Sequence, residues 1–179
     1  MNGLLALARL IDRLTETVGR AAIWLILVAT VISAGNALSR YALGASSNAW
    51  LELQWYLFGA LFLLAAGYTL KHNGHVRIDI FYNRLGPRGQ AWTDLLGGLF
   101  FLLPMAVLLA WLAWPMFYEA WVTREMSPDA GGLVRWPVKL LLPLGFALLA
   151  LQGVAEIIKR AGVLTGHVAL SRETPEEPV

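Results

Sequence analysis

The apolar positions of this sequence fall into four long runs that contain no charged residue. The runs cover residues 21–39, 53–70, 95–118 and 140–155. A helix rises about 1.5 Å per residue and needs roughly 20 apolar residues to cross a hydrocarbon layer of about 30 Å. The fourth run reaches this length if its helix begins near Pro137 and the Lys139 side chain extends to the membrane surface. The pattern predicts an all-α integral membrane protein with four transmembrane helices, at about 21–43, 50–71, 90–118 and 137–158.

The composition agrees with a chain that lies mostly in lipid. Hydrophobic residues make up 58% of the 179 residues and charged residues only 15%, whereas about 25% of the residues in a soluble domain are charged. No gap between the runs reaches the roughly 50 residues of a small domain. We therefore expect residues 1–160 to form a single four-helix membrane domain and residues 161–179 to form a cytoplasmic tail, whose end is expected to be disordered.

Lys and Arg residues are unequally divided between the two sides of the predicted bundle. Ten lie on the side of the termini: Arg9, Arg13, Arg20, Lys71, Arg77, Arg84, Arg88, Lys159, Arg160 and Arg172. Four lie on the opposite side: Arg40, Arg124, Arg135 and Lys139. Because positive residues are retained in the cytoplasm, both termini are expected there, which is an N-in, C-in topology. The net charge of +2 is too small to indicate a nucleic-acid partner.

The first twenty residues carry an apolar stripe ahead of the first run. Leu4, Leu7, Ile11, Leu14 and Val18 recur at spacings of three and four, as on one face of a helix. This pattern predicts an N-terminal amphipathic helix that anchors to the membrane surface or docks on a partner. A plain lead-in to the first span is the alternative.

The loop between the second and third runs has helix-boundary signals of its own. Asp79 is a preferred N-cap residue, and Gly86 followed by Pro87 is a stop signal. A short cytoplasmic helix is expected between them. Basic residues beside this face attract anionic lipids, so Arg77, Arg84 and Arg88 are candidates for contact with lipid headgroups.

The sequence contains few residues that could form a reactive or ligand-binding site. It has no cysteine, and the histidines His72, His75 and His167 all lie outside the charge-free runs, where solvated loop positions are expected. We therefore predict no catalytic site, cofactor site or metal site, and expect a membrane subunit that works through a partner. Two alternatives remain: a membrane-anchor subunit of a redox complex, which would carry histidines on its helices, and a stand-alone small exporter, which would carry an acid within the membrane.

An ordered set of residues at the ends of the runs resembles a known family. Asn36, Arg40 and Tyr41 close the first span, Trp50 and Glu52 open the second, and Gly-His-Val-Arg-Ile-Asp follows the second at 74–79. Trp136, Pro137, Pro143 and Gln152 mark the fourth span. In this order, residues 21–159 resemble the small permease (DctQ-type) subunit of tripartite ATP-independent periplasmic (TRAP) transporters. The run at 74–79 is the most specific part of the resemblance.

The resemblance implies a fold, a role and a set of partners. It implies a multi-pass protein of the bacterial cytoplasmic (inner) membrane that scaffolds a large TRAP permease subunit. The large subunit would carry the substrate and sodium sites, and a periplasmic substrate-binding protein would deliver an organic acid for sodium-dependent uptake. The candidates for family-signature or assembly residues are Arg40, Glu52, Gly74, His75, Arg77 and Asp79.

Most of these candidates also have a purely structural interpretation. Glu52 lies near a helix start, where a carboxylate is favoured, and it could equally contact Arg40 or the large subunit. Arg40 could extend to the headgroups of the outer leaflet. His75, Arg77 and Asp79 could set the turn and cap of the loop instead of binding a partner.

Labelling of introduced cysteines tests the predicted topology, since the chain has no native cysteine. Because the four-span model places them outside, Ser46→Cys and Pro128→Cys should react with a membrane-impermeant maleimide in intact cells with a permeabilised outer membrane. Asn83→Cys and Thr174→Cys should react only after the cells are lysed. Reaction of Asn83→Cys in intact cells would contradict the four-span model.

Overall fold

The computed structural model describes residues 1–75 and 82–167, which are mostly helical. The elements of this part are α1 (Asn2–Leu43), α2 (Asn48–Lys71), α4 (Pro87–Gly97), the π-helical turn η1 (Gly98–Leu102), α5 (Leu103–Val122) and α6 (Trp136–Leu164). The elements α4, η1 and α5 follow one another without a break. Together with α1, α2 and α6 they provide four helices that are long and apolar enough to cross a membrane. The predicted helical class and the four membrane-spanning helices are confirmed.

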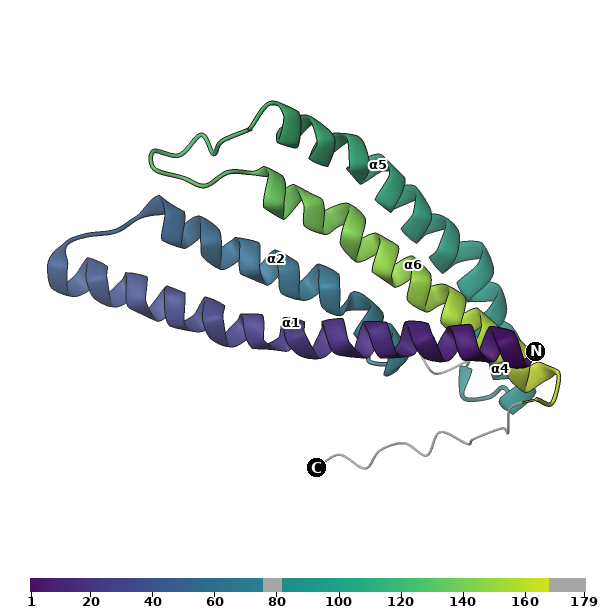
Figure 1. Cartoon of the computed structure of the whole chain (residues 1–179). Helices are drawn as coiled ribbons and strands as arrows, with labels where there is room; N and C mark the ends of the chain where they lie inside the picture. Colours follow the sequence, from purple (N-terminus) through teal and green to yellow (C-terminus); the bar gives the residue numbers. More distant parts are fainter. Residues whose placement is uncertain (76–81, 168–179) are drawn as a thin grey trace.

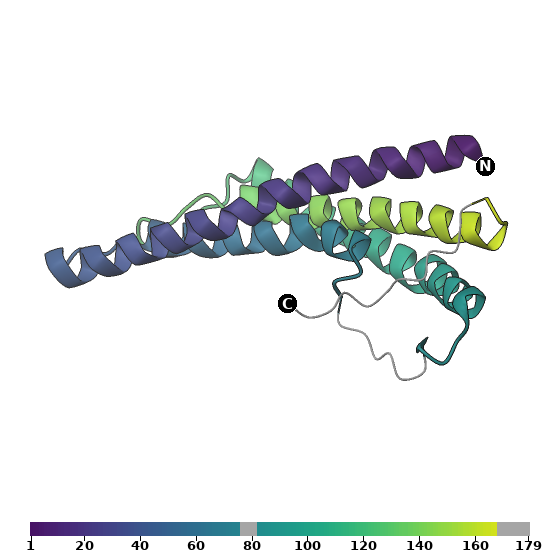
Figure 2. The same ribbon diagram turned by 90° about the horizontal axis from the view of Figure 1, so that it is seen from below.

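The four long helices lie in a row, which we call the slab, in the order α1, α2, α6 and α5 (Figure 1). The two connections at 44–47 and 123–135 lie at one end of the slab, the loop end. The N-terminus, α4 and the last turns of α6 lie at the opposite end, the terminal end. Viewed at right angles, the last turns of α6 run between the start of α1 and α4 (Figure 2). The slab therefore has two broad faces, with α2 and α6 as its inner helices and α1 and α5 at its edges.

The helix α1 is uninterrupted from Asn2 to Leu43. The amphipathic segment predicted for the first twenty residues is thus helical and continuous with the first span. At about 1.5 Å per residue its 42 residues extend about 63 Å, roughly twice the thickness of a hydrocarbon core. Only Ile11 of the predicted stripe is buried, in contact with α6, whereas Leu7 and Leu14 are exposed. A lipid or partner contact of this segment remains a prediction.

Small residues occupy most of the buried apolar positions inside the slab. Ten of the thirteen buried apolar residues in the described part are alanines. At Gly145 of α6, an added Cβ atom would lie 2.9 Å from the carbonyl oxygen of Leu63 on α2, so the close approach of these two helices requires glycine. Helices in lipid gain little by burying apolar side chains against one another, so their backbones pack closely through small residues instead.

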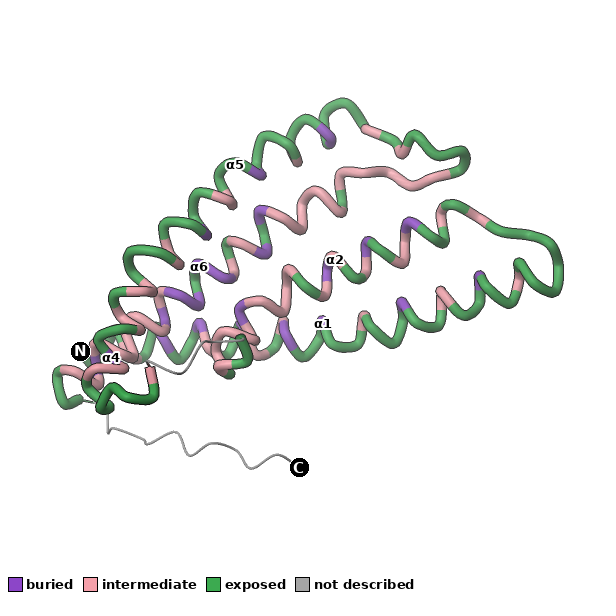
Figure 3. The backbone as a smooth tube through the Cα atoms, turned by 180° about the vertical axis from the view of Figure 1, so that it is seen from behind, coloured by how far each residue is buried: buried purple, intermediate pink, exposed green. Residues whose placement is uncertain are grey.

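Bulky apolar side chains point outward instead. Phe62, Phe101 and Trp111 are each more than three-quarters exposed within the chain. Figure 3 shows exposed residues along most of α1 and α5, and more buried residues on α6 than on any other helix of the slab. The slab therefore has almost no enclosed apolar core, and its faces are suited to lipid or to another membrane subunit.

The third span contains the π-helical turn η1 immediately before Pro104. Because a proline has no N–H and crowds the carbonyl four residues before it, a wider turn relieves the conflict at this point. In the preceding loop, the start of the predicted short helix at Asp79 falls outside the described residues, and at 82–86 the chain forms a turn, in which the Leu85 N–H donates to the Tyr82 carbonyl at 3.0 Å. The same holds for the end of the predicted tail, from residue 168 onward.

Candidate functional site

The loop end is held by a carboxylate on α2. Glu52 is only 3% exposed. Its Oε2 atom accepts a hydrogen bond of 2.6 Å from the backbone N–H of Leu133, and its Oε1 atom accepts one from the Ser127 hydroxyl. Ser127 and Leu133 lie near the two ends of the 123–135 connection, and the Ser127 N–H donates to the Leu133 carbonyl at 3.0 Å. One carboxylate therefore holds both arms of this connection against α2.

Two neighbours of Glu52 on the same face of α2 add further hydrogen bonds. Asn48 lies one helical turn before Glu52, and its side-chain amide donates to the carbonyl of Ala130 at 3.0 Å. Tyr56 lies one turn after, and its hydroxyl donates to the carbonyl of Val134 at 3.2 Å. Residues four apart share a helix face, so all three side chains point at one connection. We call Asn48, Glu52 and Tyr56, with the backbone they hold, the loop clamp.

Contacts of Glu125 and Arg135 also stabilise the 123–135 connection. The Arg135 N–H donates to the carbonyl of Glu125 at 2.9 Å, and the Lys139 amino group pairs with the Glu125 carboxylate. The guanidinium of Arg135 lies 5.8 Å from the ring centre of Trp55, within the range of a cation–π contact. These bonds fold the connection back over the ends of α2 and α6.

The positions of Glu52 and Arg40 limit the roles left open by the sequence. Glu52 lies in the second turn of α2, which follows the N-cap residue Ser47, so it is not the cap. Arg40 does not meet Glu52; its Nη2 atom donates to the Ser46 hydroxyl at 3.2 Å. The sequence alone did not reveal the contacts of Glu52 with Ser127 and Leu133, which lie 75 and 81 positions away.

A second polar group, the terminal cluster, joins α1, α2 and α6 near the terminal end. Its members are Asp12 and Glu16 on α1, Lys71 and His72 at the end of α2, and Gln152, Glu156 and Lys159 on α6. Asp12 Oδ1 accepts from Gln152 Nε2 at 2.8 Å and from Lys159 Nζ at 3.1 Å. The Gln152 side chain is completely buried. This network connects α1 to α6 where the helices continue beyond the charge-free runs.

Glu16 provides the link between α1 and α2. Its Oε2 atom lies 2.8 Å from Lys71 Nζ and 2.9 Å from His72 Nε2. Glu16 precedes the charge-free run, which begins at residue 21, and the neighbouring Lys71, His72 and Arg20 hold the pKa of its carboxyl well below the ordinary range. The prediction of a solvated loop position for His72 was therefore incomplete, because its ring is half exposed but contacts Glu16.

An ion pair joins α4 to α6 beside the terminal cluster. Arg160 Nε lies 3.1 Å from Asp94 Oδ2, and the Tyr82 hydroxyl donates to the same oxygen at 2.8 Å. Asp94 thus fixes the start of the third span against the end of the fourth.

The remaining sequence candidates lie at the terminal end or outside the described residues. The N–H of Gly74 donates to the Thr69 carbonyl at 2.9 Å, which ends α2, and His75 is exposed. Arg84 and Arg88 are exposed, as contact with lipid headgroups would require. Arg77 and Asp79 fall outside the described residues. Among the residues described, no group of three or more His, Asp or Glu side chains could hold a metal ion.

Comparison with known protein families shows which family this chain belongs to. Residues 29–162 match the model of the DctQ component of tripartite ATP-independent periplasmic transporters. This match covers most of the chain, from the middle of α1 to the end of α6. The chain belongs to the DctQ family. A search of curated proteins finds no match.

Membership in the DctQ family settles the class of function. The chain is a small permease component of a TRAP transporter, a membrane protein of transport and not an enzyme. Of the three possibilities left by the sequence, the family supports the transporter subunit over the redox anchor and the stand-alone exporter. The matched region includes the whole loop clamp and the α2 and α6 members of the terminal cluster, but not Asp12 and Glu16 on α1.

Removing the Glu52 carboxylate should release the connection between α5 and α6. In Glu52→Ala the Leu133 amide loses its acceptor, so its hydrogen exchange should accelerate roughly tenfold, as expected for the loss of one hydrogen bond. Glu52→Gln keeps one acceptor oxygen and should show a smaller effect.

Hydrogen–deuterium exchange of the peptide that contains Leu133 measures this release. Glu119→Ala is the matched control, because Glu119 is an exposed carboxylate near the loop end. Unchanged exchange in Glu52→Ala would show that the loop clamp does not hold the connection.

Proposed function

We propose that this chain is a fixed scaffold for the large permease subunit during sodium-dependent uptake of an organic acid. In this proposal the large subunit binds sodium and the transported acid, and a periplasmic binding protein delivers the acid. This chain holds the large subunit in place within the inner membrane of a bacterium. The observation that carries the proposal is the form of the slab. It is a single layer of helices with apolar faces, and its polar contacts, the loop clamp and the terminal cluster, lie toward its two ends.

The distribution of charge within the spans supports a scaffold role. The four charge-free runs contain no carboxylate and no basic residue that could bind a sodium ion or an organic acid near the middle of the membrane. Transporters that move ions through their own helices keep such residues there, because the energetic cost of burying a charge is justified by function. In this chain the charged side chains instead hold helices and connections together near the ends of the slab.

The exposed surface of the slab supports a contact with another membrane subunit. Side chains such as Phe62 and Trp111 extend outward from its helices, and little apolar area is enclosed within it. A thin layer of this kind can present one face to a large subunit and the other to lipid. Lipid is therefore proposed as its second partner, in contact with the outer faces and with Arg84 and Arg88 at the surface.

The proposed orientation places the loop end in the periplasm. It follows from the excess of Lys and Arg at the terminal end, which the cytoplasm retains. The clamped connection at 123–135 then lies on the side from which the binding protein approaches. The leucines of the first turns of α1, Leu7 and Leu14 among them, would contact lipid or the large subunit on the cytoplasmic side.

The proposal is tested by uptake into vesicles that contain the complex. Glu119→Gln and Asp94→Asn each remove one carboxylate near a span end. Because neither carboxylate binds the coupled ion in a scaffold, uptake per assembled complex should keep its dependence on sodium. Omitting this chain should instead lower the recovery of the large subunit and abolish uptake.

For the two variants, the readouts are the initial uptake rate at increasing sodium concentration and the amount of large subunit recovered with the tagged chain. For the sample without this chain, they are the uptake rate and the total amount of large subunit in the membrane. If either variant lost sodium dependence at normal recovery of the complex, this subunit would take part in ion coupling and the scaffold proposal would fail. Full uptake without this chain would contradict it equally.

A further inference from the structure

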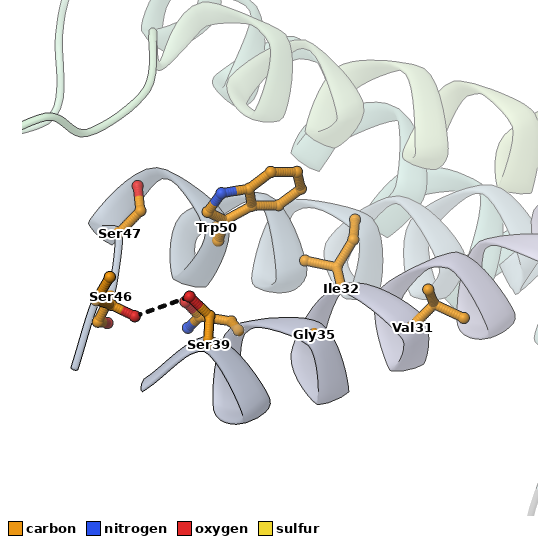
Figure 4. A pocket seen from close by; sticks show the side chains of 9 residues that line it. Val31, Ile32, Gly35, Ser39, Ser46, Ser47 and Trp50 are labelled. Carbon is orange, nitrogen blue, oxygen red and sulfur yellow. Dashed lines mark hydrogen bonds between the residues drawn. The ribbon is translucent and has the colours of Figure 1, made fainter. Parts of the chain in front are cut away.

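A groove opens between α1 and α2 at the loop end of the slab. It has a volume of about 660 Å³, and its lining includes Val31, Ile32, Gly35, Ser39, Ser46 and Trp50. Figure 4 shows Val31, Ile32 and Gly35 along one stretch of α1, with the hydroxyl residues and Trp50 toward the end of the helix hairpin. Neither the loop clamp nor the terminal cluster contributes to it.

The lining changes from apolar to polar along the helix axis. Val31 and Ser39 are eight residues apart, which corresponds to about 12 Å on a helix. The apolar end lies within the charge-free run, and the run ends at Ser39. The hydroxyl groups and the half-exposed indole of Trp50 therefore fall at the depth where the hydrocarbon layer meets its headgroups.

A cation lies at the polar end of this groove. The Arg40 guanidinium donates to the Ser46 hydroxyl at 3.2 Å, and Ser46 is part of the lining. Arg40 itself lines an adjoining groove, and Asn36 lines both. The Ser39 hydroxyl donates to the Ala45 carbonyl at 3.1 Å, whereas the Ser46 hydroxyl accepts from Arg40 and keeps its own proton for donation. A phosphodiester at the mouth would therefore meet the Arg40 guanidinium and the Ser46 hydroxyl together, which is a favourable set for this anion.

Asn36 is a polar side chain that needs a partner. It is only 9% exposed, and within the described part of the chain its amide makes no hydrogen bond to another residue. An amide in an apolar layer is costly without such a bond. Asn36 lies about 4.5 Å deeper along the helix than Ser39, where the ester carbonyls of a phospholipid lie below its phosphate.

We propose that this groove holds one glycerophospholipid of the leaflet at the loop end. Its phosphate lies beside Arg40 and Ser46, an ester carbonyl accepts from the Asn36 amide, and one acyl chain runs along Gly35, Ile32 and Val31. The order of phosphate, ester and acyl chain along a lipid matches the order of the lining. The proposal requires only that the chain is embedded in a membrane, and it is independent of the proposed scaffold role and orientation.

The assembled complex in lipid nanodiscs provides the test. One sample contains a phospholipid with a photoreactive diazirine near the end of an acyl chain, and another contains a diacylglycerol with the same chains. Labelled residues are mapped by mass spectrometry after irradiation. The phospholipid should label Val31 and Ile32 several-fold more than Phe62 and Phe101, which are exposed apolar side chains outside the groove. The diacylglycerol should show a weaker preference, because it lacks the phosphate.

Three variants separate the acyl chain from the headgroup. A Cβ atom at Gly35 would meet no other atom within 4 Å, so a side chain at this position of the groove lining starts in open space. Gly35→Leu should therefore occupy the groove and remove most labelling at Val31 and Ile32. Arg40→Gln should reduce labelling by the phospholipid to the level of the diacylglycerol. Arg124→Gln is the control, since Arg124 is an exposed arginine near the loop end outside both grooves.

The proposal is overturned if Val31 and Ile32 are labelled no more than Phe62 and Phe101, or if Gly35→Leu leaves their labelling unchanged. It is also overturned if lipid does not label the groove while Gly35→Leu lowers recovery of the large subunit. In that case a helix of the partner occupies the groove. Equal effects of Arg40→Gln and Arg124→Gln would refute the headgroup contact.

Discussion

In lipid, the helices of this chain gain little free energy by burying apolar side chains against one another, and the structure follows from that constraint. In water a single layer of four helices would collapse around a core. In a bilayer the bulky side chains can stay outside, and the helices meet through alanine and glycine. Gly145 on α6 brings α6 against the backbone of α2, a contact that any larger side chain would prevent. The resulting layer is thin, so its stability and shape depend on a few close contacts.

Polar bonds near the two ends of the layer supply the specificity that apolar packing does not. The Glu52 carboxylate and the side chains of Asn48 and Tyr56 hold the α5–α6 connection on α2. Toward the other end, Asp12 and Glu16 join α1 to α6 and α2. Such bonds fix the relative positions of the helices and leave both broad faces apolar. This arrangement suits a subunit that stays still while another one moves.

The sequence predicted the spans much better than the contacts between them. Charge-free runs are a property of consecutive residues, so four membrane helices could be read directly from the pattern. Glu52 was recognised as a residue of interest, but its partners Ser127 and Leu133 lie on a distant connection that no local pattern points to. Asp12 and Glu16 lie off the apolar stripe of the first twenty residues, and the sequence assigned them no partner on another helix. Their spacing of four residues was the one available signal that they share a face. The roles predicted for Asp79 and Arg77 remain predictions, because both residues lie outside the described part of the chain.

The central claim is that this subunit is a rigid body during transport, and electron-spin distance measurements test it most directly. Spin labels on Ser46→Cys and Pro128→Cys report the separation of the two hairpin connections at the loop end. The account predicts one distance distribution for the assembled complex in nanodiscs, unchanged when sodium and the substrate-loaded binding protein are added. A second distance population that appears only on their addition would contradict it, because the slab would then move with the transport cycle.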